Sequence, residues 1–173
     1  MFIDTETTGL SKSDQPISVG AVLAEVDTRN GVILKEIARY YGLREPSCVI
    51  TEGAYQVHGI SDYQVKNKEF DLKELVTMFE VANLIVAHNA AFDKRMLSFM
   101  SDAQPTWGCS CRDIDWPDEI GGRSLDAISK HFSLNRPVIH NSLSDTLVMI
   151  EALQQKKADG STYLLNHIRK HRL

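Results

Sequence analysis

Features that would mark several common protein classes are scarce or missing in this sequence. Its three cysteines are too few, and odd in number, for a disulfide framework. No apolar run approaches the roughly 18 residues that a membrane-spanning helix needs, and no secretory leader precedes the first apolar segment. We therefore expect a protein of a reducing, cytoplasmic compartment that does not enter a membrane. A phosphate-cradling glycine loop is also missing, which argues against a nucleotide-binding or sugar-phosphate hydrolase.

What is present is the composition of an ordinary globular protein. Hydrophobic residues make up 43% of the chain and charged residues 24%. A chain of 173 residues is long enough to bury a stable hydrophobic core without help from disulfide bonds or a structural metal. Because the sequence shows no internal repeat, low-complexity tract or interdomain linker, we expect a single domain over residues 1–173.

The charge is negative overall and unevenly distributed along the chain. The formal net charge is −4, with 11 Lys and Arg against 19 Asp and Glu in residues 1–119, and 8 against 4 in residues 120–173. The basic end could attract phosphate, and two divalent ions held by an acidic centre would strengthen that attraction. It could equally be a solvated terminal helix, since basic residues are favoured at helix C-termini. Both interpretations stay open.

The apolar pattern predicts strands first and alternating strands and helices later. Three β-prone segments lie at 2–6, 17–26 and 32–41, and the Asn30-Gly31 pair between the last two is a strong hairpin signal. They predict three antiparallel strands in a meander. The whole order predicts an α/β fold in which one mixed sheet is flanked by helices. Two later strands are expected at 83–87 and 107–110, and a loop at 112–122. Helices are expected at 51–57, 89–100, 124–132, 142–157 and around 164–168, and one more begins after an N-cap at Asp71.

Two carboxylates stand close together in the first strand. The period of two along a strand puts Asp4 and Glu6 on one face. Neighbouring carboxylates resist burial unless a positive charge joins them. A hard divalent cation such as Mg²⁺ or Mn²⁺, which prefers oxygen ligands, would serve. The alternative is a surface strand end that carries two solvated acids.

A third carboxylate follows the buried strand at 83–87. Asp93 lies one turn into the next helix, four residues after Asn89 and on the same face. The helix dipole stabilises an anion in a first turn, which suits a metal ligand. The alternative is that Asn89 is simply the N-cap and Asp93 an ordinary first-turn acid.

A histidine and a fourth carboxylate flank the start of a late helix. In the stretch His140-Asn-Ser-Leu-Ser-Asp145 the imidazole lies on a loop and the carboxylate near the helix start. Histidine, with a pKa near neutral, is a natural general base. A purely structural His–Asp pair is the alternative.

The order of these three motifs is more specific than any one of them. An Asp-x-Glu on the first strand, Asn89-Ala-Ala-Phe-Asp93 after a later strand and His140 five residues before Asp145 resemble the DEDDh exonucleases of the DnaQ-like family, within the ribonuclease H-like fold. Two further stretches, Asp4-Thr-Glu-Thr-Thr-Gly9 and Gln56-Val-His-Gly-Ile60, are similar to motifs of that family. The resemblance covers nearly the whole chain and is greatest to the exonuclease X-like branch. It implies a ribonuclease H-like mixed sheet of five strands, three antiparallel and then parallel.

The resemblance also implies a chemistry. Four carboxylates would hold two divalent metal ions, Mg²⁺ or Mn²⁺, and His140 would act as general base toward the attacking water. The expected reaction is hydrolysis of the terminal phosphodiester bond at a 3′ end, with release of nucleoside 5′-monophosphates. The implied metal ligands are Asp4, Glu6, Asp93 and Asp145.

Six further residues match family positions around the 3′ end of the substrate. A hydroxyl can meet a 3′-OH, and an apolar or aromatic surface can stack a base. For Leu10 and Phe92 the alternative is core packing, and Asn89 would orient the loop before its helix rather than touch substrate. The set implied for substrate binding is Thr7, Gly9, Leu10, His58, Asn89 and Phe92.

The substrate and the partner are less narrowly defined by the sequence. Single-stranded DNA is the favoured substrate, in repair or replication, and an exoribonuclease of the same chemistry is the nearest alternative. A different alternative is an accessory or proofreading module that mainly binds a polymerase, with the basic segment from Ser161 as a docking helix. Against a purely non-catalytic role, the residue types of all five catalytic positions are present.

Overall fold

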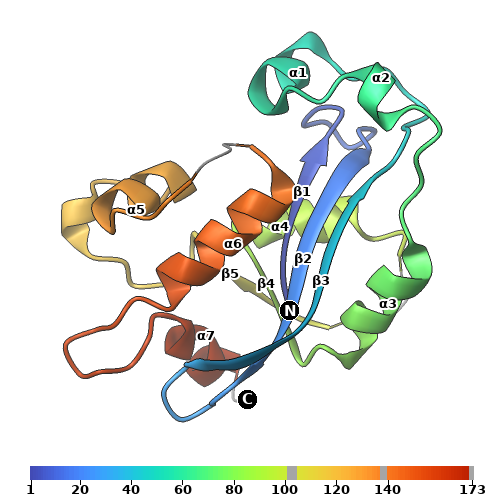
Figure 1. Cartoon of the computed structure of the whole chain (residues 1–173). Coiled ribbons are helices and arrows are strands. Elements are labelled where there is room, and N and C mark those ends of the chain that lie inside the picture. The colour runs from blue at the N-terminus through green and yellow to red at the C-terminus, as the bar shows by residue number, and fades with distance from the viewer. Residues whose placement is uncertain (101–104, 137–139, 172–173) are drawn as a thin grey trace.

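The computed structural model describes residues 1–100, 105–136 and 140–171. Five strands form one sheet in the order β3-β2-β1-β4-β5 (Figure 1). The pairs β1/β2 and β2/β3 are antiparallel, and β1/β4 and β4/β5 are parallel. The predicted α/β fold with a mixed sheet is therefore confirmed. The strands are β1 Phe2–Thr7, β2 Pro16–Val26, β3 Ile33–Leu43, β4 Leu84–Ala87 and β5 Thr106–Cys109.

The helices follow the predicted order. The predicted cap at Asp71 is confirmed, because its side chain accepts the Glu74 backbone N–H at 3.0 Å. Gly59 ends its helix in the left-handed conformation. None of the helices in the described ranges is long and apolar enough to cross a bilayer. The helices are α1 Glu52–His58, α2 Asp62–Val65, α3 Leu72–Val81, α4 Ala90–Met96, α5 Leu125–His131, α6 Ser142–Leu153 and α7 Leu164–His171, with a 3₁₀ turn at Asp118–Ile120.

Two helices are shorter than the apolar pattern predicts. α4 ends at Met96 rather than at Met100, although Leu97 and Met100 stay buried, so the apolar spacing continues past the last helical turn. α6 ends at Leu153, and its N-cap is Asn141, whose side chain accepts the Ser144 N–H. The single-turn α2 was not predicted, because four residues are too few to show a helical period.

The sheet is covered on both faces. In Figure 1, α6 crosses in front of the strands and α4 lies behind them. Along β1 the side chains alternate, so that Ile3 packs in the core beneath α3 and α4 while Phe2 packs in the core beneath α5, α6 and α7. The same alternation turns Asp4 and Glu6 toward the α6 face.

The start of α6 lies directly against β2. A Cβ at Gly20 would be 2.2 Å from the Leu143 backbone nitrogen, so only glycine allows this approach. The Thr146 hydroxyl donates to the Gly20 carbonyl at 3.0 Å, and the Ser18 and Ser142 hydroxyls are 2.6 Å apart. These contacts fix the first turn of α6 beside the centre of the sheet.

Candidate active site

Four carboxylates from three elements meet at the end of the central strands. β1 carries Asp4 and Glu6, the first turn of α4 carries Asp93, and the first turn of α6 carries Asp145. A cavity of about 830 Å³ is lined by Asp4, Glu6 and Asp145. Asp93 is 2% exposed beside it and receives the Thr5 hydroxyl at 2.9 Å. The structure thus brings together all four predicted metal ligands.

The crowding changes how these acids hold protons. Burial raises the pKa of Glu6 to about 8, and the charges of Asp145 and Asp93 add to the effect. Burial raises the pKa of Asp93 to about 7, although the Thr5 hydrogen bond opposes it. The pKa of Asp4 is raised well above its usual value by burial first, and then by the other three carboxylates. Without added cations, the cluster therefore retains protons near neutral pH.

One arginine already supplies part of the missing positive charge. The Arg136 guanidinium donates two hydrogen bonds to Asp145, at 2.9 and 2.8 Å, and these side chains are 9% and 7% exposed. A second carboxylate, Asp126, is 3.9 Å away. Sequence analysis missed Arg136, because a basic residue four positions before His140 carries no motif of its own.

His140 lies on the turn before α6, beside the carboxylates. Its ring can present a nitrogen within 4.8 Å of oxygens of Glu6 and Asp145. The ring is exposed, and the backbone φ of 56° is left-handed, which is unusual for a non-glycine residue. Such backbone strain is often found at functional sites, where the surroundings hold a side chain in one direction.

A second histidine belongs to the wall of the same cavity. The His88 Nδ1 lies 2.9 Å from the Ser110 hydroxyl oxygen. Burial lowers the pKa of His88 to about 4, so its ring is neutral at physiological pH. This agrees with a supporting role behind the carboxylates rather than with proton transfer.

The chemistry of the donor set fits hard divalent cations. Four carboxylates face one guanidinium, so the cluster keeps an excess of negative charge when ionised. Carboxylate oxygens from separate elements are the ligands that Mg²⁺ and Mn²⁺ prefer. A bound cation would favour the charged form of each acid and so displace the protons that the raised pKa values retain.

Part of the predicted substrate set is joined at the end of β1. The Thr7 hydroxyl donates to the Gly9 carbonyl at 2.7 Å. His58, the last residue of α1, accepts the Ile60 N–H at Nδ1, which leaves its Nε2–H to donate to the Thr7 carbonyl at 3.1 Å. Burial lowers the pKa of His58, and the neighbouring charge of His140 lowers it further. Thr7, Gly9 and His58 therefore lie beside the carboxylate cavity, although they are not part of its wall among the described residues.

The other three predicted residues lie on the outside. Leu10 is 81% exposed, so the alternative that it packs in the core is wrong. The Arg95 guanidinium donates to the Leu10 carbonyl at 3.1 Å and lies 5.2 Å from the centre of the half-buried Phe92 ring. Asn89 occupies the N-cap of α4 at a φ of 76°, but its side chain makes no cap hydrogen bond and instead lies 3.4 Å from Arg112.

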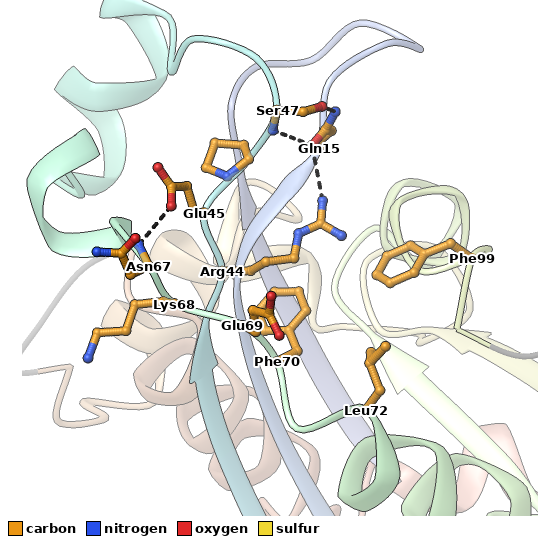
Figure 2. Close-up of a pocket in the computed structure, with 11 residues that line it drawn as sticks. Gln15, Arg44, Glu45, Ser47, Asn67, Lys68, Glu69, Phe70, Leu72 and Phe99 are labelled. Atoms are coloured by element: carbon orange, nitrogen blue, oxygen red, sulfur yellow. Dashed lines mark hydrogen bonds between the residues drawn. The ribbon is translucent and has the colours of Figure 1, made fainter.

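A second hollow, of about 750 Å³, has a different character (Figure 2). The Arg44 guanidinium lies 5.5 Å from the Phe70 ring centre and 5.0 Å from that of Phe99, and it donates to Gln15 at 3.2 Å. The Gln15 oxygen also accepts the Ser47 N–H. The Arg44 guanidinium therefore connects the segments that carry Gln15, Phe70 and Phe99. We assign this hollow a structural role rather than a catalytic one.

Comparison with known proteins agrees with this geometry. A family model described as "Exonuclease" matches residues 1–102. The PolC-type DNA polymerase III of Thermotoga petrophila is 34% identical over 165 residues, which covers 86% of this chain and 11% of the polymerase. That of Thermotoga maritima is 29% identical with the same coverage. The chain thus spans only a small part of the length of these curated relatives.

Solved structures with the same fold include two DNA complexes. Exonuclease X in complex with 5′ overhanging duplex DNA has a TM-score of 0.60 and 22% identity, and the match covers 95% of this chain and 98% of that one. E. coli Exonuclease I with a dA16 oligonucleotide has a TM-score of 0.73 and 15% identity, over 99% of this chain and 43% of that one. At these identities the likeness extends to the fold.

Proposed function

Since this chain belongs to the exonuclease family, the DnaQ-like 3′–5′ exonucleases of the ribonuclease H-like superfamily, we propose that it hydrolyses the terminal phosphodiester bond at the 3′ end of a nucleic acid. In this proposal residues 1–173 act as one exonuclease domain. The observation that carries it is the meeting of four carboxylates from β1, α4 and α6, Asp4 half-buried and the other three buried, with His140 beside them. The three cysteines are free thiols, which supports a reducing, cytoplasmic setting.

Asp4, Glu6, Asp93 and Asp145 would hold two divalent ions, Mg²⁺ or Mn²⁺. When bound, the ions would lower the pKa of water and neutralise charge on the phosphate and the leaving oxygen. Arg136 donates one hydrogen bond to each oxygen of Asp145, so a metal ion bound by Asp145 would compete with Arg136 for that carboxylate. A guanidinium freed in this way stays in the cavity wall, where it can face a phosphate oxygen.

His140 is proposed as the general base. Its exposed ring lies near Glu6 and Asp145, so it can take a proton from the attacking water and pass that proton to solvent. The left-handed backbone at His140 holds the ring close to the first turn of α6. No other ring lines the cavity among the described residues except His88, which is kept neutral by burial.

The 3′-terminal nucleotide would bind between β1 and α4. Thr7, Gly9 and His58 offer hydroxyl, backbone and ring atoms beside the carboxylates. Leu10 is exposed and Phe92 is half-buried, so both can offer apolar surface to a terminal base. Asn89 would set the direction in which the chain enters α4.

Single-stranded DNA is the favoured substrate. The solved relatives named above hold DNA, and an unpaired end can thread between the carboxylates and the apolar residues. RNA remains the nearest alternative, because the chemistry at the phosphate is the same. The two substrates differ at the 2′-OH, so the relative rates on DNA and RNA of one sequence distinguish them.

A second candidate is a proofreading module that works with a polymerase. The observation that favours it is the 34% identity to a stretch covering 11% of a PolC-type polymerase. The two candidates share one site and differ in whether the domain acts alone. If the isolated chain is as active without a polymerase as with one, the free exonuclease is favoured.

The test is to incubate the protein with single-stranded DNA and RNA of one sequence, labelled at the 5′ end, with Mg²⁺, Mn²⁺ or a chelator. We expect a ladder that shortens from the 3′ end, nucleoside 5′-monophosphates as products, a faster reaction on DNA, and no reaction with the chelator. Oligonucleotides that are bound but left intact with both metals would contradict the proposal.

A further inference from the structure

A separate cluster of metal-ligating side chains lies where α7 meets the segment after β5. His167 and His171 are four residues apart on α7, and their rings stack with centres 6.4 Å apart and planes 16° apart. The Asp113 carboxylate lies 4.0 Å from His167 Nδ1. One ligand atom of each of the three residues lies within 4.8 Å of the other two.

The polar atoms of this cluster lack the partners that burial normally requires. His167 is 0% exposed, and neither of its ring nitrogens has a hydrogen-bond partner among the residues that the structure describes. The same holds for Nε2 of His171. Buried polar atoms in folded proteins nearly always have a partner, so two orphaned imidazoles on one face point to a missing one.

The His167 ring is held in place by packing. A Cβ at Gly108 would lie 2.7 Å from His167 Nδ1, so glycine in β5 is what lets the ring lie against the sheet. The Cys109 N–H donates to Asp113 Oδ2 at 2.8 Å, which turns that carboxylate toward the ring. The site is therefore built by β5 and α7 together, and not by one helix alone.

We propose that Asp113, His167 and His171 form a second metal site, separate from the catalytic carboxylates, that binds a divalent transition metal such as Zn²⁺. Imidazole nitrogens with one carboxylate suit Zn²⁺, whereas Mg²⁺ prefers all-oxygen sites. With bonds of about 2.0 Å in a tetrahedron, neighbouring ligand atoms lie about 3.3 Å apart. The three ligand atoms, which lie within 4.8 Å of one another, would therefore approach through a small movement of their side chains. A water molecule would be the fourth ligand.

The protonation state of the cluster agrees with this assignment. Burial lowers the pKa of His167 to about 4, and the charge of Asp113 only partly opposes it. The ring is therefore neutral at physiological pH, which is the form that binds metals. Among the described residues, the other charged group that acts on the cluster is Lys170, on the same helix.

Lys170 is the competitor for the carboxylate. Its ammonium pairs with Asp113 Oδ1 at 2.5 Å, while its side chain is 52% exposed. A half-exposed lysine can move into water at little cost. The metal would then link α7 to the segment after β5. Cys111, two residues before Asp113 in that segment, lines the carboxylate cavity.

The test is a Zn²⁺ titration by calorimetry, and a Co²⁺ titration followed by visible absorption, of the whole chain in excess Mg²⁺. Excess Mg²⁺ would compete with Zn²⁺ for the carboxylate pocket and leave the imidazole cluster free, because Mg²⁺ prefers oxygen ligands. We expect one equivalent of Zn²⁺ to bind, with a tetrahedral Co²⁺ spectrum. His171→Ala should weaken Zn²⁺ binding by about 100-fold or more, since even the loss of a group that orients a ligand costs 10–100-fold.

Matched variants separate metal binding from folding. His131→Ala removes an exposed histidine of α5 and should leave Zn²⁺ affinity unchanged. Asp113→Asn tests the carboxylate in case His171→Ala fails to fold, and Lys170→Met should tighten binding. Equal Zn²⁺ affinity in wild type, His171→Ala and Asp113→Asn, or no Zn²⁺ binding in excess Mg²⁺, would overturn the proposal. Exonuclease activity is measured separately and decides nothing here.

Discussion

The carboxylate pocket and the α7 cluster both bury ionisable groups, but burial acts on them in opposite directions. In the pocket, burial raises the pKa of Glu6 to about 8 and the acids hold protons. In the cluster, burial lowers the pKa of His167 to about 4 and the ring loses its proton. Arg136 partly balances the pocket, whereas both nitrogens of His167 lack partners within the described ranges.

The difference shows what each region needs from a bound ion. The pocket needs positive charge, because four carboxylates crowd around one guanidinium. The cluster needs coordination rather than charge, because the His167 imidazole is neutral and both of its buried nitrogens lack partners among the described residues. A hard ion suits the first region and a transition metal suits the second.

We expect the largest effect, on the exonuclease rate, from a substitution that alters the carboxylate pocket and leaves the α7 cluster unchanged. Asp4→Asn should lower the exonuclease rate by on the order of 10³-fold, because it removes a charge on which the metal pair depends. It should not lower the melting temperature of the metal-free protein, since it relieves repulsion among the acids. Steady-state assays and thermal unfolding measure the two effects. Asp118→Asn, at an exposed acid, is the control, and an Asp4→Asn protein as active as this control would contradict the assignment.

A second change removes the cation that the pocket already has. Arg136→Met leaves Asp145 buried without its partner and should lower the metal-free free energy of unfolding by about 3 kcal/mol at neutral pH. It should also strengthen Mg²⁺ or Mn²⁺ binding, because a competitor for Asp145 is gone. Denaturant unfolding and metal titration measure the two effects. Arg123→Met, at an exposed arginine of the same cavity, should change neither by much, and weaker metal binding in Arg136→Met would count against the competition.

A third change tests how the fold positions the pocket. Gly20→Ala places a methyl group 2.2 Å from the Leu143 nitrogen and should destabilise the protein by about 2 kcal/mol through overpacking. It should also lower activity, because Asp145 moves with the first turn of α6. Gly53→Ala in α1, where a Cβ meets nothing within 4 Å, should be neutral or slightly stabilising. If Gly20→Ala matched Gly53→Ala in unfolding and activity, the close approach would not be a requirement.

The last comparison of the two regions uses pH and is expected to give the smallest change per step of the measurement. Each carboxylate with a raised pKa binds its proton more tightly in the folded state, so metal-free stability falls as pH rises from about 4 to the folded pKa values of about 7 for Asp93 and about 8 for Glu6. His167 acts oppositely, because its lowered pKa makes stability fall as pH drops from about 6.5 to about 4. Each group changes the free energy by at most about 1.4 kcal/mol per pH unit within its window.

Variants and metals separate these two slopes. Asp93→Asn should flatten the loss of stability between about pH 4 and about pH 7, and saturating Mg²⁺ should reverse that loss, because ions favour the charged acids. Saturating Zn²⁺ should instead change the dependence of stability on pH between about 6.5 and about 4, where His167 contributes. Unfolding free energies across pH measure both, and a metal-free protein that grows more stable from about pH 6.5 to 8 would contradict the raised pKa values.

The sequence predicted the pocket better than the cluster for a physical reason. Asp4 and Glu6 share a strand face, and Asp93 and Asp145 stand in the first turns of helices whose apolar pattern is visible in the sequence, so local rules indicate each position before the fold is known. Arg136 and Gly20 were missed because their roles depend on contacts across the fold, with Asp145 and with Leu143. Asp113 and His167 were missed because they are far apart in the sequence and meet only where α7 packs against the end of β5.

The most direct test of the central claim assays three proteins together on 5′-labelled single-stranded DNA in Mg²⁺: wild type, His140→Ala and His171→Ala. The account predicts 3′ shortening by wild type that chelator abolishes, a loss on the order of 10²-fold or more in His140→Ala, and nearly full activity in His171→Ala. Full activity in His140→Ala, or a wild type that binds the DNA and leaves it intact with Mg²⁺ and with Mn²⁺, would contradict it.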